Sequence, residues 1–268
     1  MPLADEFSGS FVRRRGRFDQ KALDDLGPRD SSALALAPAP SPGDVRRVAS
    51  RAIKKPESWG AWTALAVFLI LPQLPLSRWI ASDTSVADIV AYAKWLGTAA
   101  AILAWVTLVE KRPLHSIGIH RPGWDTLGWA LVMTAALVAS LMLSYALILP
   151  ALGLELNRVA TKSITDLSLV SQLALFVRAG VTEEILFRGY PIERLLELTR
   201  SKWIAAVVPG ILFIAGHYLF WGVGQLIVVA FGTVIFTLFY LWRRDLICCM
   251  IAHILADLIG FTLARLQS

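Results

Sequence analysis

Cysteine and charged residues are scarce in this sequence. Of its 268 residues, two are cysteine and 17% are charged, whereas 56% are hydrophobic. Because Cys248 and Cys249 are adjacent in an apolar segment, they exclude a disulfide framework and a cysteine-based zinc motif, and we interpret them as small core residues rather than acylation sites. The low charge and the mean hydropathy of +0.59 exclude a water-soluble core and predict a polytopic membrane protein.

A signal peptide is also missing. Residues 1–56 contain neither the compact apolar core nor the small-residue cleavage site of such a peptide, so we expect them to stay on the mature protein. They hold 11 of the 26 Lys and Arg residues around an Ala, Pro, Ser and Gly stretch at 33–43, with too little apolar surface to offset ordering. We predict a disordered basic cytoplasmic tail that is attracted to anionic lipid headgroups and does not bind nucleic acid.

Residues 57–268 contain seven apolar segments, each long enough to cross the roughly 30 Å hydrocarbon core of a bilayer as a helix. The segments are 59–80, 89–109, 124–149, 167–198, 203–220, 225–242 and 246–266. Tryptophans lie near the segment ends, as in an aromatic belt, at positions Trp59, Trp79, Trp124, Trp203, Trp221 and Trp242. We predict an all-α transmembrane bundle of about seven helices.

Prolines and one lysine interrupt the apolar segments. Pro72, Pro75 and Pro209 predict kinks, whose freed carbonyl groups neighbouring helices can satisfy. Lys94 is near one end of its segment, so we expect its ammonium group to reach the membrane surface. Residues 149–167 are expected to form an external loop with Glu155, Arg158 and Asp166, or to hide an eighth, re-entrant segment.

The distribution of loop charges predicts the orientation. If the basic tail is cytoplasmic, three further loops fall inside and hold eight basic residues: Lys111, Arg112, Arg121, Arg194, Arg200, Lys202, Arg243 and Arg244. The opposite side holds half as many: Arg78, Arg158, Lys162 and Arg265. The positive-inside bias therefore predicts a plasma (inner) membrane protein with a cytoplasmic N-terminus and an external C-terminus.

The fourth segment contains the residues that fit lipid least well. Positions 182–190 read T-E-E-I-L-F-R-G-Y, which places Glu183, Glu184 and Arg188 within six residues. Charged side chains at membrane depth are costly and usually face a bundle interior or a water-filled cavity at a functional site. On a helix Glu184 and Arg188 share a face and can pair. Glu183 points about 100° away, so it needs a different partner.

Two later segments carry further polar pairs at helical spacing. One reads F-I-A-G-H at 213–217, and the other reads H-I-L-A-D at 253–257. If the fourth helix runs through Pro191 to residue 198, Glu183 lies about 22 Å from its cytoplasmic end, beside His217 at about 21 Å and Asp257 at about 17 Å. These residues would then share one layer inside the membrane. A helix that stopped at Tyr190 would leave Glu183 too shallow to meet His217.

These motifs resemble those of the CPBP intramembrane proteases, also called the Abi family, which include CAAX-type prenyl endopeptidases and bacteriocin-processing or immunity proteins. The family pattern E-E-x-x-x-R, then F-x-x-x-H, then H-x-x-x-N or D, is met over about 165–260. The matching residues are Glu183, Glu184, Arg188, Phe213, His217, His253 and Asp257. Asp257 stands where the prenyl endopeptidases carry Asn. The resemblance implies a protease domain over 57–268 that cuts a membrane-embedded peptide or protein, prenylated or bacteriocin-like.

The resemblance also implies residue roles. Glu183 and His217 would activate water for amide hydrolysis, while His253 and Asp257 would stabilise the oxyanion or orient the site. A carboxylate desolvated in an apolar cavity suits a general base. Glu184 and Arg188 would hold the helix face in place by pairing.

Zinc remains an open alternative at this stage. Glu183, His217 and His253 are ligand types that zinc accepts, and catalytic zinc commonly has three protein ligands and a water. The H-E-x-x-H helix of many zinc proteases is missing. A metal-free glutamate mechanism is equally compatible with the spacing.

Other functions are compatible with the same residues. Acidic and His residues inside membrane helices also form proton relays in ion-coupled transporters, although no internal repeat is visible. A non-catalytic immunity or scaffold protein, or a purely structural polar network, could also hold them. Arg178 lies in the fourth segment and could pair with Asp257, bind a substrate carboxylate or extend to the membrane surface.

Overall fold

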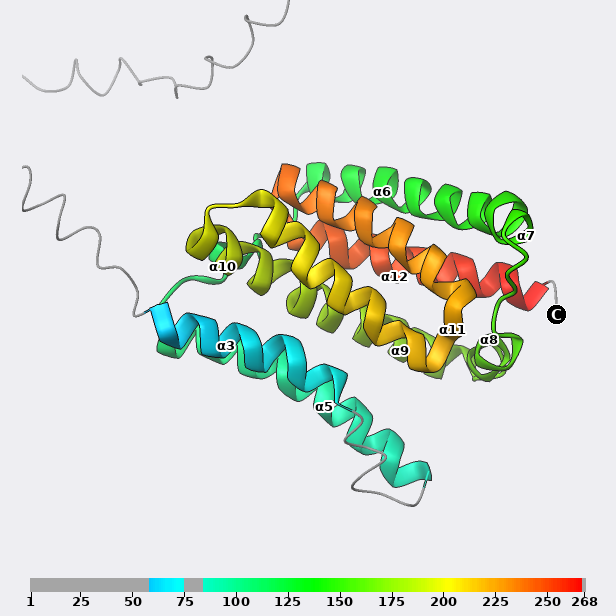
Figure 1. Cartoon of the computed structure of the whole chain (residues 1–268), viewed down its shortest axis with the longest axis horizontal. Coiled ribbons are helices and arrows are strands. Elements are labelled where there is room, and N and C mark those ends of the chain that lie inside the picture. Colours follow the sequence, from blue (N-terminus) through cyan, green and yellow to red (C-terminus); the bar gives the residue numbers. More distant parts are fainter. Residues whose placement is uncertain (1–57, 75–83, 267–268) are drawn as a thin grey trace, which may run out of the picture. The chain divides into compact units, whose positions relative to one another are not determined.

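The computed structural model describes residues 58–74 and 84–266, which lie within one compact unit, Lys55–Ser268. The basic tail predicted at 1–56 lies outside the described residues, as do Pro75, Arg78 and Trp79. Every regular element in the described part is a helix (Figure 1). The predicted all-α helical bundle is therefore confirmed.

The first two predicted segments form α3 and α5. Helix α3 (Ser58–Ile70) ends in the 3-10 turn η1 (Leu71–Gln73), and α5 (Thr84–Ala104) continues into a π-helical turn, η2 (Trp105–Val109). Pro72 at the start of η1 has no N–H and cannot continue an α-helix. The described apolar helix at this segment, Trp59–Gln73, is consequently shorter than a typical membrane span.

The third segment is α6 (Trp124–Leu143), followed by the π-helical turn η4 (Ser144–Ile148) and the short α7 (Leu149–Ala151). A 3-10 turn, η3 (Leu114–Ile117), precedes α6. The predicted external loop after α7 contains a helix, α8 (Arg158–Thr165). The alternative prediction for this region was a re-entrant segment. Asn157 caps α8 by accepting from the Ala160 N–H at 3.1 Å, and the helix axis then bends by 114° into α9.

The fourth segment forms one helical run from Leu169 to Thr199. It consists of α9 (Leu169–Glu184), a π-helical turn η5 (Ile185–Gly189) and α10 (Tyr190–Thr199). Helix therefore continues through Pro191, as the deeper placement of Glu183 requires. A π turn adds one residue to a helical repeat, and such turns are frequent at functional sites.

The fifth and sixth segments are the two halves of α11 (Lys202–Arg243), which turns back on itself at Gly222 (Figure 1). Gly222 has φ +74° and ψ −176°, a conformation that is essentially restricted to glycine. Phe213 and Phe236 contact the same guanidinium, that of Arg188, at 4.2 and 5.0 Å. A straight helix would separate these residues by roughly 35 Å, so the two halves are antiparallel neighbours.

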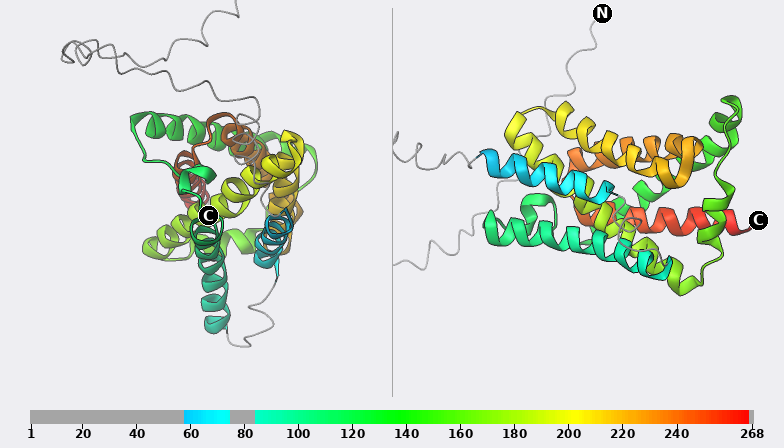
Figure 2. Two further views of the ribbon diagram at one scale, coloured as in Figure 1. Left: turned by 90° about the vertical axis from the view of Figure 1, so that its left-hand side faces the viewer. Right: turned by 60° about the horizontal axis from the view of Figure 1, so that its bottom comes forward.

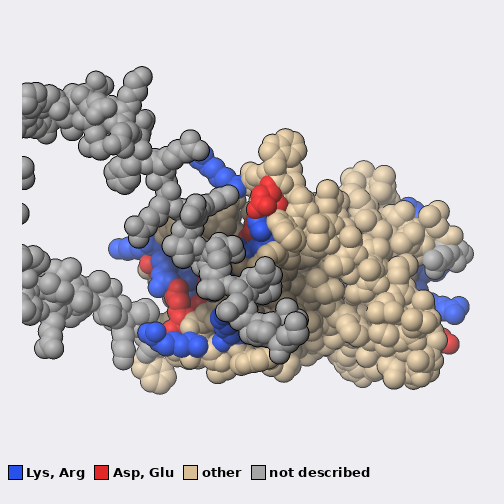
Figure 3. Space-filling view, turned by 90° about the horizontal axis from the view of Figure 1, so that it is seen from above, with Lys and Arg blue, Asp and Glu red and all other residues tan. Residues whose placement is uncertain are grey.

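Helix α12 (Leu246–Leu266) is the seventh segment and packs most extensively against α6 and α9 (Figures 1 and 2). By length and composition, four helices of the described part can cross a membrane, or five if α8 and the run after it form one broken span. Seen from above, charged residues gather toward the two ends of the described unit and leave an uncharged band between them (Figure 3). The chain is therefore built as an integral membrane protein.

Ion pairs join the segment after η2, helix α10 and the turn after α11 at one end of the bundle. Arg194, counted above as a loop residue, is 2% exposed and contacts Glu110 at 2.6 Å and Glu197 at 3.3 Å. Arg112 contacts Glu197 at 2.6 Å, and Arg244 pairs with Glu193. The loops that the charge count assigned to the cytoplasm therefore lie together.

Candidate active site

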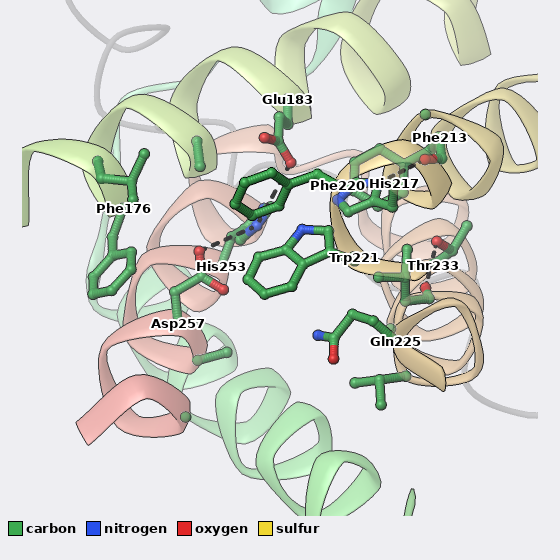
Figure 4. A pocket seen from close by; sticks show the side chains of 18 of the residues that line it. Phe176, Glu183, Phe213, His217, Phe220, Trp221, Gln225, Thr233, His253 and Asp257 are labelled. Carbon is green, nitrogen blue, oxygen red and sulfur yellow. Dashed lines mark hydrogen bonds and ion pairs between the residues drawn. The ribbon is translucent and has the colours of Figure 1, made fainter. Parts of the chain in front are cut away.

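A cavity of about 580 Å³ lies between the helices, at the depth of the polar motifs. Residues from α5, α6, α8, α9, α11 and α12 line it. Glu183 from α9, His217 from α11, and His253 and Asp257 from α12 are all on its wall (Figure 4). The structure thus brings together four residues from three motifs that are far apart in sequence.

Glu184 is turned away from the cavity and into the protein. Its side chain is 0% exposed, and its Oε1 atom lies 3.0 Å from Arg188 Nη1. The guanidinium of Arg188 lies over the rings of Phe213 and Phe236, which adds cation–π attraction. The predicted Glu184–Arg188 ion pair is therefore present, and it is completely shielded from solvent.

His253 connects α12 to both glutamates of α9. Its Nδ1 atom lies 2.8 Å from Glu184 Oε1, and since a carboxylate accepts, Nδ1 carries the hydrogen. Its Nε2 atom lies 3.7 Å from Asp257 Oδ2 and 4.0 Å from Glu183 Oε2. Glu184 therefore fixes the imidazole ring so that Nε2 is presented to the two carboxylates of the cavity.

The bond between Glu184 and His253 was not predicted from the sequence. Helical periodicity shows which residues share a face, but it does not show which helix that face meets. One available signal was Gly180, a small residue one turn before Glu184 on the same face. A Cβ atom at Gly180 would lie 2.6 Å from Ile254 Cγ1 and 3.1 Å from the Met250 carbonyl oxygen, so glycine permits α12 to approach closely.

His217 is oriented by its own helix. Its Nδ1 atom lies 2.7 Å from the Phe213 carbonyl oxygen, and because a carbonyl can only accept, Nδ1 donates. The neutral ring then has its lone pair on Nε2. Within the described residues no direct hydrogen bond or ion pair joins His217 to Glu183, although both line the cavity. A small molecule such as water would be needed to connect them.

Of two basic residues on the cavity wall, Lys94 differs from expectation, and one of the three alternatives for Arg178 is not met. Lys94 does not extend to the membrane surface: its Nζ atom donates to the carbonyl oxygens of Pro72 at 2.8 Å and Leu74 at 3.0 Å. It thereby satisfies carbonyl groups where α3 ends at its proline. Arg178 makes no ion pair with Asp257 in the described structure.

The donor atoms are not arranged as a metal site in the described residues. No group of three or more His, Cys, Asp or Glu side chains there is placed to hold a metal ion. One nitrogen of His253 is engaged by Glu184, and its other nitrogen is 4.0 Å from Glu183. The ligand set considered for zinc, Glu183, His217 and His253, does not converge in this conformation.

The fold and the site define an integral membrane protein that holds carboxylate and imidazole groups around a cavity between its helices. Residues 165–259 match the family model described as type II CAAX prenyl endopeptidase Rce1-like, which supports the resemblance of this segment to the CPBP family of CAAX proteases. The match covers all three motifs and supports protease activity at the level of the family. No curated protein and no solved structure matched the chain.

Proposed function

We propose that this protein is an intramembrane endopeptidase that hydrolyses a peptide bond in a membrane-associated peptide of CAAX type. The observation that carries the proposal is the different environment of the two adjacent glutamates. Glu184 is 0% exposed and its Oε1 atom is engaged by both Arg188 and His253, whereas Glu183 is 12% exposed and faces the cavity. Only Glu183 is therefore free to act on a water molecule.

In the proposed reaction, a water molecule sits between Glu183 and the Nε2 lone pair of His217. Glu183 accepts a proton from this water. At the same time, the oxygen of the water attacks the carbonyl carbon of the scissile bond. The C–N bond then breaks, and the proton passes from Glu183 to the leaving nitrogen. A base placed within one water of the reacting atoms suits such general acid–base chemistry. His253, whose Nε2 lies 4.0 Å from Glu183 Oε2, stabilises the developing oxyanion, and Asp257 holds the His253 ring in place.

The remaining wall of the cavity supports a lipid-linked substrate. Beyond the polar residues it is formed largely by apolar and aromatic side chains, including Phe176, Phe220, Trp221 and Phe261. The ring centroids of Phe176 and Phe261 lie 5.3 Å apart. Phe176 lies on the same side of the pocket as Asp257 (Figure 4). An isoprenyl chain or an apolar peptide end would be desolvated here, which favours binding.

The test is cleavage by purified protein in proteoliposomes, with a synthetic S-farnesyl peptide that ends in a CAAX-type tetrapeptide. Wild-type protein should release the C-terminal fragment, and Glu183→Gln should release none while its unfolding midpoint stays near wild type, because the amide keeps the shape of the side chain. A Glu183→Gln protein that cleaves at the wild-type rate would contradict the proposal. If wild type binds the peptide without cutting it, a scaffold function is supported, and proton-coupled uptake would instead indicate a transporter.

The same assay decides between a metal-free and a zinc mechanism. We propose that no metal takes part, because the donor atoms do not converge on one point. Protein treated with a chelator and shown by elemental analysis to be zinc-free should keep its full rate. Loss of activity that is restored by zinc alone would overturn this part of the proposal.

A further inference from the structure

Arg178 is a cation on a membrane helix that makes no direct ion pair within the described residues, although Asp257 is near enough to interact with it electrostatically. It lies on α9 and lines the cavity, and its Nε and Nη1 atoms are buried without a hydrogen-bond partner in the described structure. An unpaired charge in an apolar environment is costly, so it is retained where it has a function. The hydrolytic mechanism proposed above does not use this residue.

The guanidinium of Arg178 is nevertheless held in a defined position. Its Cζ atom lies 5.2 Å from the centre of the Tyr92 ring and 5.7 Å from that of Trp95, both on α5. Cation–π contacts of this kind stabilise a cation and restrict its movement. They leave the Nε and Nη1 donors without a hydrogen-bond partner in the described structure, so the guanidinium can still bind an anionic ligand.

The cavity is electrically polarised as a result. Lys94, whose ammonium group is bonded only to carbonyl oxygens, adds a second positive charge to the same part of the wall. The carboxylates of Glu183 and Asp257 lie near His253 and form no direct ion pair with Arg178 or Lys94 in the described structure. A ligand that extends between these regions would bring a peptide bond to the carboxylates and a negative charge to the cations.

We propose that Arg178 binds the free C-terminal carboxylate of the peptide substrate, two to three residues beyond the scissile bond. Arg178 precedes Glu183 by five residues, which corresponds to about 7.5 Å along the helix axis. An extended peptide advances by about 3.3 Å per residue, so this distance fits two to three residues. A planar guanidinium can bind a carboxylate through two parallel hydrogen bonds. This inference rests on the proposed endopeptidase function.

The experiment compares two S-farnesyl peptides of identical sequence in proteoliposomes, one with a free C-terminal carboxylate and one with a C-terminal carboxamide. Wild type should cleave the acid with a kcat/KM about 10- to 100-fold above that of the amide, since hydrogen bonds to charged groups have this effect. Arg178→Gln should abolish the preference for the peptide with a free carboxylate, because it should lower kcat/KM for that peptide and leave kcat/KM for the carboxamide peptide unchanged. Arg178→Lys should keep part of it. Lys162→Gln, which removes an exposed cation on α8, should leave the ratio unchanged.

The outcomes separate this inference from the proposed function. If wild type cleaves neither peptide, the endopeptidase function fails, and this inference with it. If it cleaves both at equal rates, the function stands and the carboxylate anchor is wrong. If Arg178→Gln slows both peptides equally and the effect depends on anionic lipid content, a lipid phosphate occupies the site instead, and the inference is overturned.

A stability measurement shows whether the Arg178→Gln variant is still folded. Arg178 makes no ion pair in the described structure, so Arg178→Gln should leave the unfolding midpoint in detergent titration unchanged or raise it. Functional residues often lower the stability of a protein, and replacing one can therefore increase it. A lowered midpoint together with equal loss on both peptides would assign Arg178 a structural role and overturn the inference.

Discussion

At the scale of single residues, the two neighbouring glutamates have opposite surroundings. Glu184 accepts hydrogen bonds from Arg188 at 3.0 Å and from His253 at 2.8 Å, and it is buried. The residue is therefore the junction of an ion pair within one helix and a contact between two helices. Removing it affects both.

Glu184→Gln should destabilise the protein by about 3–5 kcal/mol, because it leaves Arg188 as a buried charge without a partner. The expected result is a lower unfolding midpoint in detergent titration, with Glu183→Gln as the matched control. Adding Arg188→Gln should restore only part of the stability, since the bond to His253 stays altered. A Glu184→Gln protein that is as stable as wild type but inactive would show that the roles of the two glutamates are exchanged.

The separation of the glutamates could be predicted because helical rotation alone turns Glu183 about 100° away from Glu184. The contact of Glu184 with His253 could not, since it depends on how α9 and α12 pack. The same holds for Lys94, whose carbonyl partners exist only because α3 ends at Pro72.

At the scale of helices, the packing of α9 on α12 depends on Gly180. A Cβ atom there would come within 3.2 Å of three atoms of α12, including the backbone nitrogen of Ile254. Close backbone approach through small residues is a common basis of helix association in membranes. It sets the distance between Glu184 and His253.

Gly180→Ala should push α12 away from α9, at an overpacking cost of about 1–3 kcal/mol, and should reduce peptide cleavage at least tenfold. Cleavage per folded protein is the measurement. Gly128→Ala on α6 is the matched control, because a Cβ at Gly128 meets nothing within 4 Å. Adding Ile254→Ala, which removes the nearest obstructing atom, should restore part of the activity. Full activity of the single variant would contradict this account of the interface.

The seven apolar segments could be located from hydropathy, because each contains a helix in the part that the structure describes. Helix α8 was harder to predict, since its eight residues are polar enough to resemble a loop. Contacts with a neighbouring helix stabilise α8. Gln172 on α9 donates to the carbonyl oxygens of Ile164 and Thr165 at the C-terminal end of α8. Such contacts leave no periodic trace in the sequence.

At the scale of the whole molecule, the charged ends set the orientation. Ion pairs gather the loops around Arg112, Arg194 and Arg244 at one end of the bundle. These loops hold the larger share of basic residues, which favours the cytoplasmic side. We therefore retain the predicted orientation, with the C-terminus external.

A reporter fused after Ser268 should lie outside the cytoplasm. Alkaline phosphatase fused there should be active, and green fluorescent protein fused there should be dark. The same reporters inserted after Arg200, in a loop at the opposite end, should give the reverse result. Fluorescence from the C-terminal fusion would exclude the odd number of crossings.

The contact between Glu184 and His253 spans 69 residues of sequence, which has a consequence for biosynthesis. At about 5–20 residues per second, a ribosome needs roughly 3 to 14 s to proceed from the glutamate to the histidine. During that interval Arg188, only four positions later, already neutralises Glu184 inside the nascent helix. The chain therefore carries its own temporary counter-ion, and the contact between Glu184 and His253 forms only when α12 packs against α9. The cavity and its polar wall are thus completed only after the last helix has been made.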